Sequence, residues 1–195
     1  MATPITARDR AKAERSDALL TAAAALFAER GFSGVSLEDI GAAVGVSGPA
    51  VYRHFAGKQA LLGALLVGVS RDLVAGGTAV SDAAPGDEER MRGLIGFHVD
   101  FALGHAPVIR VQDRDLAYLN DADRADVRRL QRAYIDLWMT ALAALRAVPS
   151  DELRLRVQAG FGLINSTPHS TRSAARTQAA TAAVLADMAY AALTA

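Results

Sequence analysis

The chain has 195 residues, of which 51% are hydrophobic and 22% are charged, so it can bury a sizeable core and is not a disordered polypeptide. Its 21 basic and 21 acidic residues leave no net charge, which excludes a uniformly basic nucleic-acid binder and requires any DNA affinity to come from a local patch. The lack of cysteine excludes disulfides and thiolate metal sites and favours a cytoplasmic protein, for which we expect no cofactor.

The N-terminal segment predicts a helix. Residues before about Arg8 are typical of a frayed basic arm, which either is solvated or lies along a DNA backbone. Apolar residues then recur at helical spacing from about Asp9 to Arg30, and Gly31 supplies a helix stop. Basic residues ahead of the apolar run Ala18–Ala28 also suit a signal peptide, but acidic residues interrupt them, so we favour a helix of the folded chain. No apolar run approaches the ~20 residues of a membrane span, and no membrane contact is expected.

The stretch from Ser36 to residue 62 predicts two short helices joined by a tight turn. Ser36 is placed to cap the first helix together with Asp39, and Gly45 is placed to end it in a left-handed conformation. Ser47 then caps the second helix, and Pro49 lies in its first turn, where a missing N–H is harmless. This order is typical of a helix-turn-helix, whose second helix enters the major groove of DNA.

The rest of the chain also predicts helices and no strand. A longer helix begins at Lys58 and runs to about Ala75, and we expect a loop through Gly76-Gly77 and Ser81–Asp87. Further helices are predicted over Glu88–Gly104, over Pro107–Asp113, from a cap at Asp121 or Asp123 to Arg146, over Asp151–Ser166 before a break at Pro168, and over Ser173–Leu193. The predicted fold is all-α, with a three-helix DNA-binding domain over residues 1–56 and a larger helical ligand-binding and dimerisation domain over residues 57–195.

Small residues mark the last two helices. Alanines lie near one stripe of the final helix, and small or aromatic residues of the preceding helix fit the same contact: Ala175, Ala179, Ala182, Ala186, Ala189, Gly160 and Phe161. Val184, Leu185 and Met188 lie beside this stripe. Because small side chains let helix backbones approach closely, we expect this helix pair to pack against a second copy of itself as a two-fold dimer. The alternative is that the stripe lies inside one monomer.

These residues carry a family resemblance. The ordered, gap-free pattern resembles the DNA-binding signature of the TetR family of bacterial repressors, and it covers about Ala18–Leu62: Phe27, Gly31, Phe32, Ile40, Gly45-Val46-Ser47, Tyr52-Arg53-His54-Phe55, Lys58 and Leu61. Gly41 and Val44 depart from it, since alanine is commonest at both positions. The resemblance implies a homodimer formed by the last two helices, a palindromic double-stranded operator, and release of the DNA by a small effector. Two alternatives stay open, namely an activator and a constitutive repressor without a ligand.

The start of the predicted recognition helix would approach the DNA closely. Ser36 and Ser47 could each combine a helix cap with a phosphate contact. The second helix begins with three residues that have small or nonpolar side chains, which suit contact with a thymine methyl group but offer few hydrogen bonds: Gly48, Pro49 and Ala50.

Four further residues complete the predicted DNA contacts. The resemblance assigns Tyr52 and His54 as hydrogen-bond donors to phosphates. Lys58 lies at a helix start, where its charge adds to exposed N–H groups that face a phosphate. Arg53 is the best candidate to read a guanine edge, because the helix start hydrogen-bonds so little. Any of these residues taken singly could be ordinary packing or a solvated surface group.

The effector is less well specified. Candidate cavity-lining residues are aromatic or polar and lie on the body helices, although aromatic residues at helical spacing are usually core: Phe97, Phe101, Tyr118, Tyr134, Trp138, Asn165 and His169. Arg110 belongs to an arginine-rich middle segment that either is solvated and paired with aspartates or binds a phosphate-bearing ligand. Residues 110–120 and 165–170 also resemble regulators that respond to acyl-coenzyme A thioesters.

An enzyme is the main competing class. His98, Asp100 and His105 could suggest a metal or acid–base site, but their spacing lacks the i, i+4 histidine pair of a helical zinc motif. No nucleophile elbow or glycine-rich phosphate loop occurs in the sequence. We therefore expect a protein that is not an enzyme.

Overall fold

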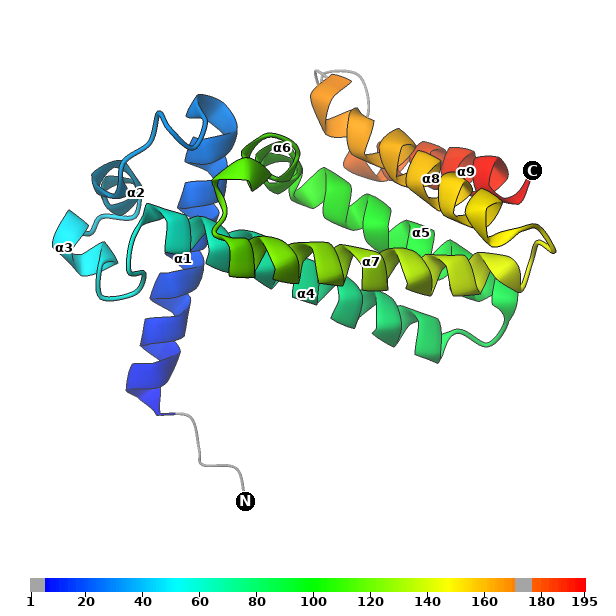
Figure 1. The fold of residues 1–195 in the computed structure, drawn as a ribbon, viewed down its shortest axis with the longest axis horizontal. Coiled ribbons are helices and arrows are strands. Elements are labelled where there is room, and N and C mark those ends of the chain that lie inside the picture. The colour runs from blue at the N-terminus through cyan, green and yellow to red at the C-terminus, as the bar shows by residue number, and fades with distance from the viewer. Residues whose placement is uncertain (1–5, 171–176) are drawn as a thin grey trace.

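The computed structural model describes residues 6–170 and 177–195, without the side chains of residues 167–170. Within these ranges the chain is all helical and has no strand, which confirms the predicted fold class. Figure 1 shows α1 to α3 at one end of an elongated molecule and α8 with α9 toward the other. The elements are α1 (Ala7–Arg30), α2 (Leu37–Ala43), α3 (Gly48–Val51), α4 (Lys58–Ala83), α5 (Asp87–Gly104), α6 (Ala106–Asp115), the 3-10 helix η1 (Leu116–Tyr118), α7 (Asp121–Ala143), α8 (Ser150–Ser170) and α9 (Gln178–Thr194).

Local capping explains how the helix-turn-helix forms. The Ser36 hydroxyl accepts from the Asp39 N–H at 3.0 Å, and the Ser36 N–H donates to the Asp39 carboxylate at 2.8 Å, so the predicted capping box at α2 is confirmed. Gly45 has a φ of 71°, the left-handed conformation expected after α2. Ser47 is the N-cap residue of α3, as predicted, but its side chain makes no capping hydrogen bond.

The predicted loop at Gly76-Gly77 is wrong, because α4 continues to Ala83. Both glycines lie where neighbouring helices come close. A Cβ atom at Gly76 would lie 2.4 Å from the Phe97 ring, and one at Gly77 would lie 2.7 Å from the Tyr134 ring. The weak helix propensity of glycine, roughly 1 kcal/mol per residue, is therefore outweighed by close packing of α4 against α5 and α7.

By length and composition, α4 is apolar enough to cross a membrane, although no apolar run of that length was expected from the sequence. The bent pair formed by α5 and residues 106–118 would pass the same test only if the two were counted as one span. In the fold, α4 lies against α5 and α7, and Leu62 and Leu66 are fully buried. A core helix of a water-soluble fold has the same composition, so this feature carries no argument for a membrane.

Several body helices differ from the prediction at their ends. The cap of α7 is Asn120, whose side chain accepts from the Asp123 N–H at 2.8 Å, and neither Asp121 nor Asp123 is the cap. Helix α8 passes the expected stop at Ser166 and ends at Ser170. Helix α9 begins at Gln178, capped by Thr177, and the expected start at residue 173 lies outside the described residues.

Two hydrophobic clusters build the core. The first joins α1, α2 and α3 to the beginning of α4 and to residues of α6 and α7, such as Val111 and Val127. The second joins α5 and the end of α7 to α8 and α9, with Trp138 fully buried. The first cluster crosses residues 56 and 57, so the DNA-binding unit shares its core with the body, and the domain boundary there stays a prediction.

Most of the alanine stripe of α9 faces the inside of the monomer. Ala182 and Ala186 pack against the second cluster and Ala189 is fully buried, while a Cβ atom at Gly160 of α8 would lie 3.2 Å from Leu193. The assignment to a contact between copies is therefore wrong for these residues, whereas Ala179 is exposed and Ala175 lies outside the described residues. Val184 and Met188, which the sequence places beside the stripe, face outward, as does Leu155 of α8.

Candidate functional site

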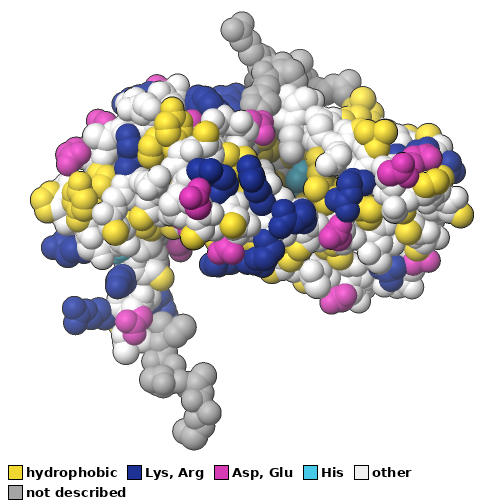
Figure 2. Space-filling view, viewed as in Figure 1, with side chains coloured by type: hydrophobic (Ala, Val, Ile, Leu, Met, Phe, Trp, Pro, Cys, Tyr) yellow, Lys and Arg dark blue, Asp and Glu magenta, His cyan; other side chains and the backbone are white. Residues whose placement is uncertain are grey.

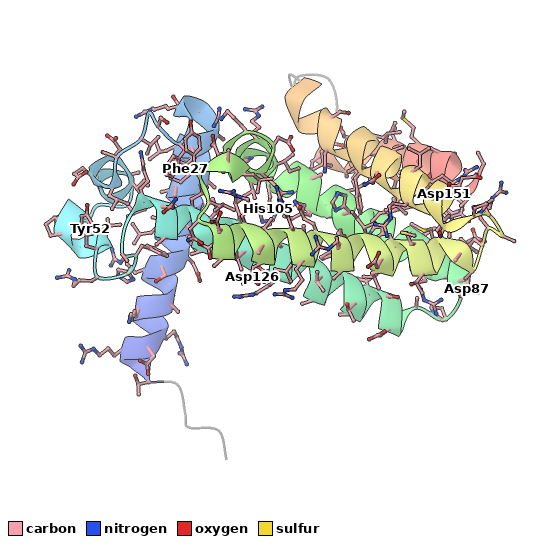
Figure 3. All side chains as sticks on the ribbon, in the orientation of Figure 1. Phe27, Tyr52, Asp87, His105, Asp126 and Asp151 are labelled. Atoms are coloured by element: carbon pink, nitrogen blue, oxygen red, sulfur yellow. The ribbon has the colours of Figure 1, made fainter. Side chains whose placement is uncertain are left out.

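The exposed tip of the helix-turn-helix is the first candidate site. Tyr52 is 56% exposed and follows directly on the short helix α3, and Figure 3 shows it at the end of the molecule, away from the body. Arg53, Pro49 and Ser47 are also exposed. This arrangement places an aromatic hydroxyl and a guanidinium side by side on the surface that a helix-turn-helix presents to DNA.

Other predicted DNA contacts are engaged inside the protein. Gly48 is buried, and a Cβ atom there would lie 3.0 Å from the Glu38 carboxylate, so its lack of a side chain serves the packing of α3 against α2. The Ser36 hydroxyl is occupied in the α2 cap. Ala50 is half-buried.

His54 joins the recognition segment to α1. Its Nδ1 lies 2.9 Å from the Ser16 hydroxyl, which leaves Nε2 as the ring atom for any contact with DNA. Sequence reasoning missed Ser16, because no local pattern links two residues that are 38 positions apart.

Lys58 closes the turn between α1 and α2. Its ammonium donates to the carbonyls of Phe32 at 2.8 Å and Val35 at 2.7 Å, and it lies 4.5 Å from the centroid of the Phe32 ring. Two of the three ammonium hydrogens are therefore used within the protein, a role that the sequence did not reveal.

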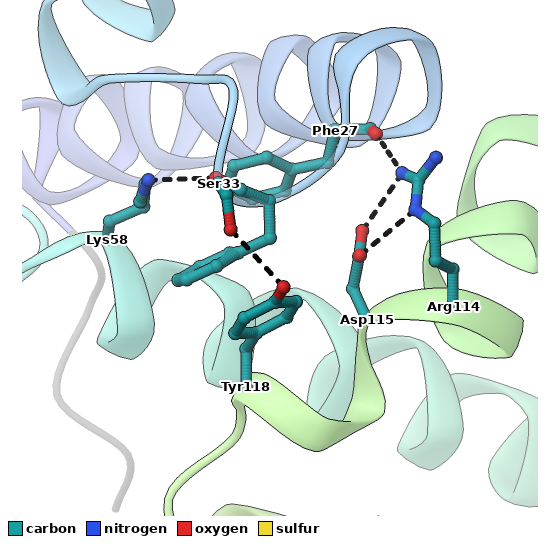
Figure 4. Close-up of polar contacts among 7 residues, drawn as sticks. Phe27, Ser33, Lys58, Arg114, Asp115 and Tyr118 are labelled. Atoms are coloured by element: carbon teal, nitrogen blue, oxygen red, sulfur yellow. Dashed lines mark hydrogen bonds and ion pairs between the residues drawn. The ribbon is translucent and has the colours of Figure 1, made fainter.

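The segment of α6 and η1 forms a joint with the end of α1, as Figure 4 shows. Arg114 pairs with Asp115 and donates to the carbonyl of Phe27 in α1. Tyr118 stacks on Phe32 with 4.7 Å between ring centroids. Its hydroxyl also accepts from Ser33 at 3.2 Å, so the structure places this residue at the joint, although the sequence analysis had placed it in a ligand cavity.

A cavity of about 160 Å³ lies inside the body between α4, α5, α6, α7 and α8. Of the predicted ligand residues, Tyr134 and Asn165 line it, and Trp138 packs against it from the second cluster. The full lining is Ser70, Leu73, His98, Gln112, Leu130, Gln131, Tyr134, Ile135, Phe161 and Asn165.

A second, more open cavity of about 350 Å³ lies on the other side of Leu73. Phe97 and Phe101 line it, together with Asp100 and His105. Arg110 is exposed on α6 and lines neither cavity, and the side chain of His169 lies outside the described residues.

Aromatic rings line the smaller cavity, the one of about 160 Å³. Tyr134 stacks on Phe161 with 5.6 Å between centroids, and the His98 ring lies 4.7 Å from Phe161. Burial lowers the pKa of His98 from 6.5 to about 4, an effect that Asn165 partly offsets. Burial raises the pKa of Tyr134. Both groups are therefore neutral at pH 7, and the cavity wall carries no charge from them.

The arginine-rich segment is partly paired, as expected. Arg129 contacts Asp126 at 3.0 Å and Arg124 contacts Asp121 at 3.4 Å, whereas Arg128 and Arg132 are exposed on α7. Figure 2 shows basic side chains gathered over α6 and α7, next to a hollow in which a histidine is visible.

The residues that suggested an enzyme do not come together. His98 lines the smaller cavity, while Asp100 and His105 line the larger, more open one, and Figure 3 labels His105 near the end of α5. Within residues 6–170 and 177–195, no group of three or more potential metal-ligating side chains occurs.

Comparison with known proteins decides the family. Residues 19–65 match the sequence model of the bacterial regulatory proteins of the tetR family, and residues 85–169 match that of the tetracyclin repressor-like C-terminal domain. The chain belongs to the TetR family. The predicted family is confirmed, and the protein is a TetR-family transcriptional regulator with a helix-turn-helix.

Two curated relatives are similar over part of the chain. The transcriptional repressor KstR2 of Mycobacterium tuberculosis is 35% identical over 102 residues, which cover 51% of this chain and 50% of that protein. The transcriptional activator FasR of Mycolicibacterium smegmatis is 32% identical over 88 residues, which cover 45% of this chain and 40% of that protein. The matched part thus spans half or less of each relative.

Solved structures share the fold over most of the chain. A TetR-family regulator from Bordetella parapertussis has a TM-score of 0.80 at 23% identity and covers 90% of this chain and 93% of its own. KstR2 of M. tuberculosis has a TM-score of 0.78 at 21% identity, covering 91% and 93%. AibR in complex with isovaleryl coenzyme A and operator DNA has a TM-score of 0.73 at 21% identity, covering 89% and 97%.

Proposed function

We propose that this TetR-family regulator is a ligand-responsive repressor that binds a palindromic operator as a homodimer and is released by a small effector. The observation that carries the DNA-binding part is the exposed pair Tyr52 and Arg53 at the tip of the helix-turn-helix. Because the chain has no net charge, one such unit makes few phosphate contacts, and tight binding requires two. The two recognition segments would then lie about 34–36 Å apart, in successive major grooves.

The outer face of α8 and α9 supports the dimer. Leu155 is 66% exposed, Met188 is 52% exposed and Val184 is 40% exposed, an unusual exposure for large apolar side chains. Ala159 and Gly162, which follow Leu155 at helical spacing in α8, are small and exposed as well. We propose that these residues, rather than the inward alanine stripe, form the four-helix contact with a second copy.

The smaller cavity supports the proposal of an effector. Ser70 and Leu73 line it from α4, the helix whose first residue, Lys58, closes the DNA-binding unit. Gln112 lines it from α6, which carries the Arg114 contact to α1. A molecule that changes the spacing of α4 and α6 would therefore act on both connections to the DNA-binding unit.

An acyl-coenzyme A thioester is the effector class that we propose. AibR has been crystallised with such a ligand, and the exposed Arg128 and Arg132 of α7 offer phosphate partners. Isothermal titration calorimetry should show tighter binding of isovaleryl coenzyme A than of isovalerate. Equal or absent binding of both compounds would contradict this class of effector.

The remaining DNA contacts belong to the same proposal. Pro49 and Ser47 lie at the exposed start of α3, and His54 offers its Nε2. Lys58 would reach a phosphate only through its third hydrogen, so Lys58→Ala is expected to weaken binding to all sequences and also to loosen the α1–α2 turn.

The operator itself provides the test. DNA bound by the full-length protein is selected from a random pool, and the affinities of variants are then measured at fixed salt concentration. Arg53→Ala should reduce discrimination against a substituted base pair by about 1–3 kcal/mol. Arg129→Ala, which removes a charge paired with Asp126 on α7, is the matched control and should change neither affinity nor preference. Retention of wild-type affinity and preference in Arg53→Ala would sink the assignment.

The direction of regulation follows from a second measurement. The relatives include both a repressor and an activator. A promoter carrying the selected operator should become more active when the gene for this protein is deleted. Lower activity after deletion would favour an activator, and a response that no effector changes would favour a constitutive repressor.

A further inference from the structure

The wall of the smaller cavity is polar in places but carries no formal charge. None of its ten lining residues is Asp, Glu, Lys or Arg, and its histidine is neutral at pH 7. The remaining lining consists of leucine, isoleucine and aromatic side chains with serine and amide groups. A charged group that entered this space would lose its hydration without gaining a partner of opposite charge, so the cavity favours an uncharged occupant.

One hydrogen-bond partner of His98 comes from Tyr134, whose hydroxyl lies 3.4 Å from Nδ1. The Trp138 indole N–H lies close enough to the Tyr134 hydroxyl to lower slightly the pKa that burial raises, although it makes no hydrogen bond of good geometry. We assign the Tyr134 hydroxyl as the donor and Nδ1 of His98 as the acceptor, because Asn165 raises the His98 pKa as an acceptor of a hydrogen on the other ring nitrogen would. In this tautomer the imidazole carries its hydrogen on Nε2.

The Nε2 atom of His98 lacks a hydrogen bond of good geometry. His98 is only 4% exposed and lines the cavity, yet within the described part of the chain its Nε2 makes no well-formed hydrogen bond. The Asn165 side chain faces His98 and raises the pKa that burial lowers, but its buried Oδ1 atom, also in the cavity wall, makes no well-formed hydrogen bond either. Native proteins rarely leave buried polar atoms without good hydrogen bonds, so this loosely paired donor and acceptor point to a polar group that arrives with a ligand.

We propose that the effector buries an uncharged, apolar group bearing one carbonyl oxygen, which accepts a hydrogen bond from Nε2 of His98. The stacked rings of Tyr134 and Phe161 flank this position. The volume of about 160 Å³ is similar to that of a ~150 Å³ protein cavity that binds benzene, so a six-membered ring or a short acyl chain fits. This inference rests on the proposed ligand-responsive function and specifies the chemistry of the buried group; any charged part of the effector stays outside the cavity.

Three small probes of similar shape separate the possibilities: cyclohexanone, methylcyclohexane and cyclohexanecarboxylate. The sequence contains one tryptophan, so the indole N–H of Trp138 gives a single resonance that reports on the cavity in two-dimensional NMR. At pH 7 the ketone should shift this resonance saturably, the hydrocarbon should bind more weakly, and the carboxylate should not bind. Carboxylate binding equal to ketone binding, or hydrocarbon binding as tight as ketone binding, would overturn the proposal.

Variants of His98 test the donor. His98→Phe should weaken ketone binding about five- to twentyfold, as loss of one hydrogen bond predicts, and leave hydrocarbon binding unchanged. His98→Gln keeps a donor and should restore ketone binding to within about threefold of the wild type, a result that a purely structural role for His98 would not produce. His105→Phe, in the open cavity, is the matched control and should bind the ketone like the wild type.

Separate measurements of folding and of DNA binding distinguish failure of this inference from failure of the proposed function. Thermal melting of each variant establishes that it folds, and binding of the selected operator is measured on the same preparations. If the wild type binds the operator but none of the probes shifts Trp138, this inference fails while the DNA-binding function stands. If the wild type binds no DNA sequence selectively, the proposed function fails whatever the probes do.

Discussion

Acid should destabilise this protein through His98. Burial holds the pKa of its imidazole at about 4 in the folded chain, against 6.5 for an unperturbed histidine. The polar groups that face it are the Tyr134 hydroxyl and the Asn165 amide, and the cavity wall offers no carboxylate that would stabilise the protonated ring. Below pH 6.5 the unfolded chain therefore binds a proton that the folded chain excludes, so stability falls as the pH falls.

The size of the effect follows from the two pKa values. Each pH unit between 6.5 and about 4 removes about 1.4 kcal/mol of unfolding free energy, and the whole interval removes about 3 kcal/mol. The loss ends near pH 4, where the folded state also takes up the proton. This is a large share of the roughly 5–15 kcal/mol by which domains are usually stable.

This loss of unfolding free energy is measured by urea unfolding of the wild type and of His98→Phe at pH 7, 6, 5 and 4.5. All samples have the same protein concentration, and Trp138 fluorescence is the signal. The difference between the two proteins should grow by about 1.4 kcal/mol per pH unit below 6.5. Capping hydrogen bonds lower the pKa values of Asp9 and Asp39, so acid also removes stability there, but equally in both proteins. Parallel pH profiles for the two proteins would refute a neutral, buried His98.

Four further predictions rest on single contacts. Gly77→Ala should lower the unfolding free energy by about 1–3 kcal/mol, because the new Cβ atom would lie 2.7 Å from an α7 tyrosine ring. Gly68→Ala, where the new Cβ atom would meet open space, should be neutral or stabilise the protein by up to ~1 kcal/mol. Equal urea midpoints for the two variants would contradict the packing argument. Ser36→Ala should cost about 1 kcal/mol through loss of the α2 cap, and an unchanged urea midpoint would count against it. Val184→Glu should convert the proposed dimer to a monomer, and analytical ultracentrifugation that still shows a dimer would exclude this face. Tyr118→Ala should remove about 0.5–1.5 kcal/mol of stabilisation from the joint between η1 and the end of α1, because it removes the ring stacked on Phe32. Hydrogen exchange over residues 31–35 should then become faster, and unchanged exchange would contradict this role.

Local rules were enough to predict the helix-turn-helix. Ser36 with Asp39, and Gly45, act within a few residues of their own positions, so spacing and residue type specify them. The same holds for the all-helical class, since apolar residues repeat at helical spacing through most of the chain. The resemblance to the TetR family rests on the same local segment, and the match of residues 19–65 to the sequence model of that family confirms it.

Interactions over long sequence distances could not be predicted in this way. Gly76 and Gly77 suggested a loop, and only the approach of α5 and α7 keeps them in a helix. The alanines of α9 suggested a contact between copies, because a sequence shows that a stripe is small and apolar but not which neighbour covers it. The predicted phosphate ligand Lys58 proved to hold the α1–α2 turn, 26 residues from its Phe32 partner.

The sequence by itself determined the helical class, the capped helix-turn-helix and the exposed Tyr52 and Arg53, because these depend on residues near one another in the chain. Only the tertiary structure decided which aromatic residues form the joint and which line the cavity. Tyr118 and Tyr134 look alike in sequence, but one stacks on Phe32 and the other encloses His98. The physical reason is that burial and pairing are properties of a residue's neighbours in space, and those neighbours come from helices far apart along the chain.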